Sequence, residues 1–126
     1  MSRKYKFLNP QGLYFISFAV VYWLDVFIRK EYKEVLLDSW RHCMDKKGLE
    51  IYAWCIMTSH VHLIIRSKIA KPEQTIGQMK RHTSEVLKEE IQNHPQESRR
   101  ELMTWLMERA GKNNSNNKGF QFWQQH

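Results

Sequence analysis

The alternation of apolar and polar residues along the chain predicts four strands. Residues 12–23, GLYFISFAVVYW, are apolar at both alternating positions, which is typical of a central strand covered on both faces. LEIYAWCIM (49–57) alternates, and HVHLIIRS (60–67) follows it after a Thr-Ser turn or bulge. FQFWQQ (120–125) alternates aromatic and polar residues as a last strand. These segments predict one sheet.

Three further segments carry apolar residues at helical spacing. The first is RKEYKEVLLDSWRHCMDKKG (29–48), where Gly48 is suited to end the helix. The second is residues 71–94, which Pro95 ends, and the third is ESRRELMTWLMERAG (97–111), with Gly111 as its C-terminal cap. We expect the third helix to bury Leu102, Trp105, Leu106 and Ala110. The element order predicts one α+β domain with helices packed on one face of the sheet.

Size and charge narrow the class of protein. The chain has 126 residues, which fits one domain, and a net charge of +7. Residues 1–65 carry nine Lys/Arg against six Asp/Glu, and residues 66–126 carry eleven against seven, so the charge belongs to the folded domain. A polyanion such as nucleic acid is the natural partner, and solubility alone is an equal alternative. The longest apolar stretch, Leu13 to Leu24, is too short to span a bilayer, and no signal peptide is visible. We expect no membrane association, a cytoplasmic location and reduced core thiols at Cys43 and Cys55.

Two histidines interrupt the most regular of the strands. Alternate residues of a strand point to one side. One face of the strand at 60–67 therefore carries His60, His62, Ile64 and Arg66. Two imidazoles on one face can converge on a cation, although a third ligand must come from elsewhere. The alternative is two half-buried histidines that hydrogen-bond to neighbours. Burying both rings in an aliphatic strand costs free energy unless something uses them.

HVHLI resembles the His-hydrophobe-His motif of the HUH single-strand endonucleases. More narrowly, the chain is similar to the REP-associated tyrosine transposases, relatives of the insertion-sequence transposases that use a single tyrosine. The resemblance covers nearly the whole chain. It rests on GLYFISFAVV, RKEYKEVLLDS, GLEIYAWCIMTSHVHLII, ESRRELMTWLMERAGKNNSN and FQFWQQH.

The resemblance implies a ferredoxin-like or RRM-like core with a central antiparallel sheet. It implies that His60 and His62 bind Mg²⁺ or Mn²⁺, and that the metal polarises the scissile phosphate of single-stranded DNA next to a hairpin. It also implies a tyrosine that attacks in line and leaves a 5′-phosphotyrosine and a free 3′-OH. A homodimer is a further possibility.

The attacking tyrosine that the resemblance implies has no counterpart at the expected place in this sequence. Relatives carry it on a helix after the last strand, where a polar side chain usually gives the third metal ligand. The five tyrosines here all precede the histidine pair: Tyr5, Tyr14, Tyr22, Tyr32 and Tyr52. We assign the catalytic role to none of them and expect the catalytic tyrosine to lie after His126.

We expect a single HUH domain over residues 1–126 that lacks the tyrosine helix because the chain is truncated. Loss of the chemistry with retention of binding is the other explanation.

Basic residues on or near the expected helices, on the histidine strand and in the Asn-rich loop after the third helix are candidates for contacts with DNA phosphates. They are Arg66, Lys80, Arg81, Arg99, Arg100, Arg109, Lys112 and Lys118. Solvated helix faces explain each of them equally well. The alternative function is a catalytically inactive nucleic-acid-binding module of the same fold.

Overall fold

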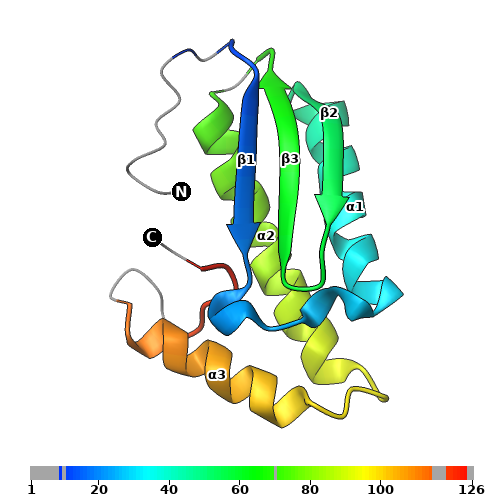
Figure 1. The fold of residues 1–126 in the computed structure, drawn as a ribbon, viewed down its shortest axis with the longest axis vertical. Helices are drawn as coiled ribbons and strands as arrows, with labels where there is room; N and C mark the ends of the chain where they lie inside the picture. Colours follow the sequence, from blue (N-terminus) through cyan, green and yellow to red (C-terminus); the bar gives the residue numbers. More distant parts are fainter. Residues whose placement is uncertain (1–8, 10, 70, 115–118, 125–126) are drawn as a thin grey trace.

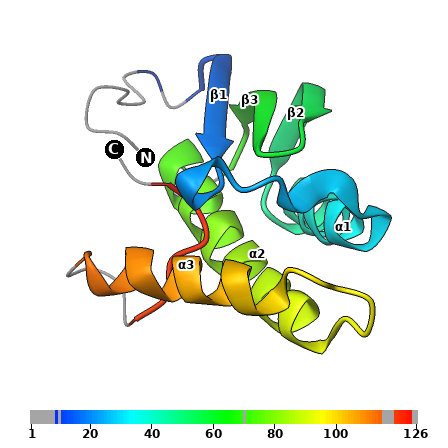
Figure 2. The same ribbon diagram turned by 60° about the horizontal axis from the view of Figure 1, so that its bottom comes forward.

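The computed structural model describes residues 9, 11–69, 71–114 and 119–124. The elements in chain order are β1 (Tyr14–Ala19), the 3-10 turns η1 (Val21–Trp23) and η2 (Val26–Ile28), α1 (Lys30–Lys46), β2 (Leu49–Ile56), β3 (His60–Ser67), α2 (Pro72–Asn93) and α3 (Arg100–Lys112). The strands form an antiparallel sheet in the order β1-β3-β2, so β3 is central. Helices α1 and α2 cover one face of this sheet, and no described helix covers the other (Figures 1 and 2). The predicted α+β fold is confirmed.

The core lies between the sheet and helices α1 and α2. The inward face of β3 supplies Val61, Leu63 and Ile65, all at most 1% exposed. The helices bury their apolar stripes against this face, with Tyr32, Leu36 and Trp40 from α1 and Ile76, Met79 and Leu87 from α2. The bounds predicted for these two helices agree with the structure within two residues. Gly48 ends α1 as predicted, with a positive φ of 70° that glycine adopts without steric cost.

The first predicted strand is shorter than expected and lies at an edge. β1 ends at Ala19. The Val20 amide still donates to Ser59 O, next to the start of β3, but the Val21 amide turns away and donates to Phe122 O, each at 2.9 Å. Residues 21–23 form η1. The prediction of a central strand covered on both faces is therefore wrong. Phe15, on the face opposite the helices, is 67% exposed.

A bulge in β2 reverses the predicted alternation of that strand. Ile51 lies opposite Ile65, and Ala53 lies opposite Ile64, so the register shifts between the two. Beyond the bulge, Trp54 turns to the helix side, where its ring meets the Trp40 ring at 5.9 Å. The prediction that Cys55 is a core thiol is wrong because the bulge leaves it exposed.

Helix α3 buries a different face from the one predicted. Met103, Met107 and Gly111 are buried, whereas Leu102 and Trp105 are each 54% exposed. Gly111 lies inside the helix and is no C-terminal cap. It is the point of closest approach to the following segment, since a Cβ there would lie 2.1 Å from the backbone nitrogen of Phe120.

The last predicted strand is wrong for the described residues 119–124. They form one isolated bridge, between Trp123 and Val20. Phe122 and Trp123 are adjacent and both buried, at 1% and 5% exposure, so the segment has no solvent-facing alternation. It is wedged between α3 and the end of β1: Gln121 N donates to Met107 O at 3.0 Å, and Gln124 N donates to Ala19 O at 2.7 Å. Within the described part of the chain, no helix is both long and apolar enough to cross a membrane.

Candidate functional site

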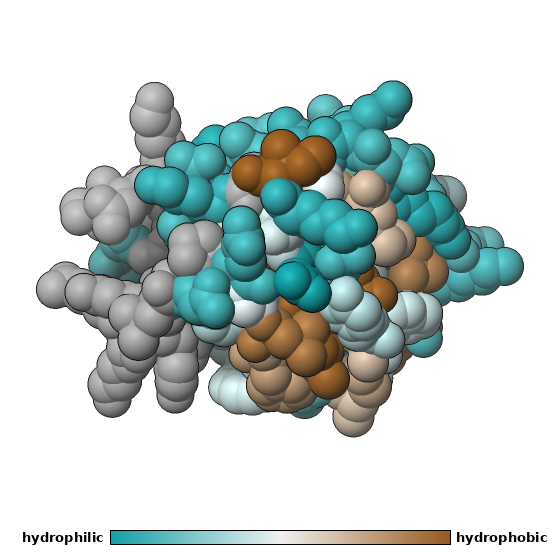
Figure 3. All heavy atoms as spheres, turned by 90° about the horizontal axis from the view of Figure 1, so that it is seen from above, coloured by the Kyte–Doolittle hydropathy of each residue, from teal (hydrophilic) through white to brown (hydrophobic). Residues whose placement is uncertain are grey.

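The histidine pair lies on the open face of the central strand. His60, His62 and Ile64 are half-buried and Arg66 is exposed, while the residues between them face the core. This is the division of faces that the alternation predicts. Figure 3, which looks along the strands from the top of Figure 1, shows apolar residues gathered on the open side of the sheet and hydrophilic residues over the helices. Half-buried Ile64 and exposed Phe15 lie on the same face as the pair, so the surface around the histidines is accessible and partly apolar.

Serine hydroxyls hold both imidazoles. The His60 and His62 ring centroids are 4.9 Å apart with an interplanar angle of 80°. Ser17 Oγ, on β1 directly opposite His62, lies 2.6 Å from His62 Nδ1, and Ser59 Oγ lies 3.2 Å from His60 Nδ1. No other described residue forms a hydrogen bond with either ring. When Nδ1–H donates to a hydroxyl, Nε2 presents its lone pair, which is the tautomer that binds a metal through Nε2.

Two exposed aromatic side chains flank the pair. The Phe15 ring stacks on the His62 ring at 5.5 Å with an interplanar angle of 19°. The Trp23 ring meets the His60 ring edge-on at 5.2 Å. Phe15, His62, His60 and Trp23 thus form a continuous series of rings, which we call the ring row. The sequence did not predict the ring row, because the turn that places Trp23 beside His60 contains no glycine, the usual sequence signal of such a turn.

The donor set of the pair suits a cation that completes its shell with oxygens. Among the described residues, no group of three or more His, Cys, Asp or Glu side chains is placed to hold a metal. His60 and His62 offer two nitrogen ligands. Mg²⁺ and Mn²⁺ prefer oxygen ligands, so most of the coordination shell of such an ion would have to be oxygens from outside the pair. The residues fit such an ion where water and phosphate oxygens occupy the remaining positions.

Four of the predicted DNA-contact residues are exposed, but the structure does not gather them in one place. Arg66 lies near the end of β3, at the top of Figure 1, whereas α3, with Arg109 and Lys112, lies at the bottom. Arg81 lies on α2. Lys118 lies outside the described residues.

The other three predicted contact residues have internal partners. Lys80 is half-buried with its Nζ 5.4 Å from the centre of the Phe18 ring, and burial lowers the pKa of this ammonium. Arg99 donates to both the side chain and the backbone oxygen of Asp25. Arg100 donates to the backbone oxygens at the end of α2. These contacts give all three a structural role, and their contact with phosphate stays a prediction.

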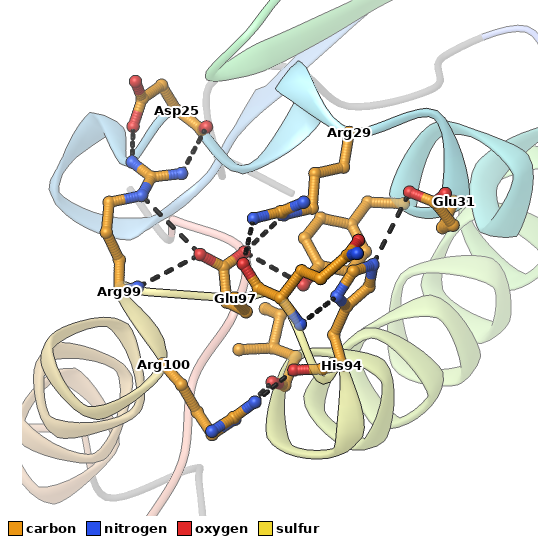
Figure 4. A network of polar contacts seen from close by, with 10 residues as sticks. Asp25, Arg29, Glu31, His94, Glu97, Arg99 and Arg100 are labelled. Carbon is orange, nitrogen blue, oxygen red and sulfur yellow. Dashed lines mark hydrogen bonds and ion pairs between the residues drawn. The ribbon is translucent and has the colours of Figure 1, made fainter.

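A buried carboxylate that sequence reasoning missed organises the segment between α2 and α3 (Figure 4). Glu97 is 5% exposed. It accepts hydrogen bonds from Tyr32 Oη and Arg29 Nε, both at 3.0 Å, and from the backbone N of Arg99 at 3.2 Å. Burial acts to raise the pKa of Glu97, but these hydrogen bonds and the Arg29 charge outweigh it, so the pKa lies below its usual value. Glu97 thus stays ionised and ties this segment to the start of α1.

The hydroxyl groups of three described tyrosines, Tyr14, Tyr32 and Tyr52, have partners other than the histidines. Tyr32 is fully buried, and burial together with Glu97 raises its pKa. Tyr14 Oη donates to the backbone oxygen of Asn9 at 2.5 Å, and Tyr52 Oη donates to Glu50 at 3.1 Å. Tyr22 lies in η1 and not in a strand as predicted, and Tyr5 lies outside the described residues.

The position expected for the catalytic tyrosine is not reached by the described residues. His126, after which we expect that tyrosine, lies outside them, and Gln124 is the last residue that they include. Gln124 is bonded to Ala19 at the end of the edge strand β1. A tyrosine beyond His126 therefore stays a prediction.

Comparison with known proteins assigns the chain to a family. The family described as "Transposase IS200 like" matches residues 14–125, nearly the whole chain. The chain belongs to the IS200-like transposase family. No curated protein matches this IS200-like transposase.

Two solved structures show the same fold as this IS200-like transposase. One is a REP-associated tyrosine transposase bound to a REP hairpin, with a TM-score of 0.58 and 16% identity. The match covers 68% of the present chain and 53% of that one, so this chain spans about half the length of that relative. The other is a candidate transposase from Deinococcus radiodurans, with a TM-score of 0.55, 19% identity and 72% of each chain covered. At these identities the likeness shows the fold alone.

Proposed function

We propose that this IS200-like transposase binds single-stranded DNA next to a hairpin and holds a Mg²⁺ or Mn²⁺ ion at the DNA backbone through His60 and His62. The observation that carries the proposal is the imidazole pair on the open face of β3, with each Nδ1 engaged by a serine hydroxyl. A cation bound there supplies Lewis-acid polarisation of a phosphate oxygen. The fold shared with a transposase bound to a REP hairpin supports this class of substrate.

The residues of this chain bind and orient the DNA. Arg66 shares the open face with the histidines, which supports its proposed contact with a phosphate on the same strand of DNA. Exposed Arg81, Arg109 and Lys112 supply positive charge elsewhere on the surface. A homodimer stays a prediction, which sedimentation velocity tests.

The complete reaction, by resemblance, exchanges phosphodiester bonds without an outside energy source. A tyrosine oxygen forms a bond to phosphorus, and the 3′ oxygen leaves with a proton as a free 3′-OH. The 3′-OH of a second strand then reverses this step and releases the tyrosine. We propose that the attacking tyrosine lies outside residues 1–126, because no tyrosine follows His62.

An inactive binding module of the same fold is the second candidate. This candidate keeps the binding of nucleic acid and has lost the tyrosine chemistry. Both candidates bind DNA, and metal binding at the histidine pair separates them.

A titration with Mn²⁺ followed by NMR tests the metal assignment. We expect the paramagnetic ion to broaden the imidazole signals of His60 and His62 before those of His42 and His94, which lie on α1 and after α2. Equal broadening of all four would show that the pair is no metal site.

Incubation of residues 1–126 with Mn²⁺ and a labelled DNA hairpin, followed by a denaturing gel, tests the missing nucleophile. We expect no covalent protein–DNA adduct, since the in-line attack needs an oxygen held about 3–3.5 Å from phosphorus. An adduct would contradict the proposal. Tyr→Phe changes at Tyr14, Tyr22 and Tyr52 would then identify the residue responsible.

A further inference from the structure

Two consecutive aromatic residues in η1 have backbone angles that side chains of this size rarely adopt. Tyr22 has a φ of 55° and Trp23 a φ of 54°. They are the only described residues other than glycine with a positive φ. Such strain persists only where the surroundings force it, and it concentrates at functional sites. Glycine would adopt this turn without strain, so the presence of two large aromatic residues needs an explanation.

The surroundings of η1 hold the turn firmly. Val20 and Val21 are buried, at 0% and 2% exposure. Their amides are bonded to Ser59 O and Phe122 O, and Trp23 N donates back to Val20 O at 3.0 Å. The backbone is therefore fixed on both sides, yet the rings that follow are left out of the core. Tyr22 is 44% exposed and Trp23 is 63% exposed.

The direction of the Trp23 ring supplies the second observation. It does not point into empty solvent but lies edge-on against His60, at one end of the ring row. Phe15, 67% exposed, lies at the other end against His62. Two exposed rings thus bracket the histidine pair, on the face that also carries Arg66.

We propose that Phe15 and Trp23 are stacking residues for two unpaired DNA bases that flank the phosphate facing His60 and His62. This inference rests on the proposed function and adds the residues that position the substrate. Base–aromatic stacking tolerates any base, because every base has a π-face, whereas a basic side chain beside it binds the backbone. The net charge of +7 and Arg66 on the same face favour a nucleic-acid strand over an apolar partner. The strained turn is the device that presents Trp23 at the required place.

The experiment measures binding of two fluorescent DNA hairpins in EDTA, so that metal plays no part. One hairpin carries a randomised unpaired flank, and the other has the same stem with a blunt end. We expect the wild-type chain to prefer the flanked hairpin. Trp23→Ala and Phe15→Ala should each weaken that binding by roughly 5- to 150-fold, the range for loss of one stacked base, and leave blunt-end binding unchanged. Trp23→Phe should keep most of the affinity. Trp105→Ala, which removes an equally accessible tryptophan from α3, is the matched control.

A second variant separates stacking from a structural role. Trp23→Gly relieves the positive φ, so we expect a higher Tm together with the same loss of flanked-hairpin binding as Trp23→Ala. A lower Tm would show that the ring serves the fold, and unchanged affinity of Trp23→Ala would show that it stacks on no base. Either result overturns the inference while the proposed function stands. A wild-type chain that binds neither hairpin overturns both.

Discussion

The serine hydroxyls beside the histidines orient the two imidazoles of the proposed metal site. Ser17 belongs to β1 and Ser59 to the turn before β3, so the two imidazoles are oriented from different segments. A hydrogen bond at Nδ1 holds the ring angle of a histidine, and where Nδ1 is the donor it leaves Nε2 able to bind a cation. The two serines are therefore positioning residues for the proposed cation, although they do not touch it.

Ser17→Ala tests this role. We expect Mn²⁺ affinity at the histidine pair to fall about 10- to 100-fold, the usual cost of removing a partner that orients a ligand. The imidazole ¹⁵N shifts of His62 should also change, because its Nδ1 loses a hydrogen-bond partner, a change that a purely structural role would not produce. Ser84→Ala, a half-buried serine on α2, is the control. Unchanged affinity and unchanged shifts would show that Ser17 does not orient His62.

Glu97 gives a prediction at the same scale for stability. Removing one member of a buried ion pair costs about 3–5 kcal/mol. Because Arg29 and Arg99 keep 26% and 31% of their side chains exposed, we expect Glu97→Gln to cost about 3 kcal/mol of unfolding free energy at pH 7, by urea denaturation. Asp38→Asn, in an exposed pair with Arg41, should cost about 0–1 kcal/mol.

The lowered pKa of Glu97 fixes the sign of its pH dependence. A depressed folded-state pKa means that the contribution is present above the ordinary value of 4.5 and is lost as pH falls through the folded value. As the pH is lowered from 4.5, the unfolding free energy of the wild type should therefore decrease more steeply than that of Glu97→Gln. If the unfolding free energies of wild type and Glu97→Gln fell in parallel with pH, Glu97 would not be the group responsible for the loss of stability.

At the scale of elements, hydrophobic spacing predicted the long helices well because α1 and α2 each pack a full apolar stripe on the sheet. The same reasoning failed for α3, which buries a narrow line through Met103 and Met107 and leaves Trp105 in solvent. It also failed at the β2 bulge and at the left-handed turn of η1. One extra residue in a strand reverses every later side chain, and nothing in the local sequence marks the position. The histidine face was predictable because β3 has no such irregularity.

The two helix glycines allow a paired prediction. Gly111→Ala should destabilise the fold by about 3 kcal/mol or more, because the new Cβ would meet the backbone of Phe120, which cannot rotate away. Gly77→Ala has nothing within 4 Å and should stabilise the fold by about 0.5–1 kcal/mol, through better helix propensity. Thermal unfolding of both variants measures the difference. A tolerated Gly111→Ala would mean that the segment at 119–120 is held less closely than the structure shows.

At the scale of the whole molecule, positive charge and exposed apolar side chains are both spread over several elements. The net charge of +7 comes from both halves of the chain, and the exposed members of the predicted contact set lie on β3, α2 and α3. The exposed rings Phe15 and Trp23 lie at opposite ends of the ring row on one face. This arrangement suits a ligand whose backbone binds broadly and whose bases bind at one place.

The salt dependence of DNA binding tests the charge. If about four phosphates of a single strand are neutralised, the affinity should fall with salt at a log–log slope of about −3. Fluorescence anisotropy from low to moderate salt measures this slope. A flat response, or equal binding to any acidic polymer, would count against nucleic-acid recognition.

The central position of β3 also determines how the site fluctuates. Its backbone is paired with β1 on one side and β2 on the other, while each of those strands has one neighbour within the described sheet. Edges fray first, and amide hydrogens of a doubly paired strand exchange with solvent only when the sheet opens as a whole. Phe15 and Ser17 lie on the edge strand β1, which we expect to open first, whereas His60 and His62 lie on the central strand β3, which we expect to open last. We therefore expect amide exchange to be slower in β3 than in β1, and the spacing of the two imidazoles to be kept when β1 opens locally.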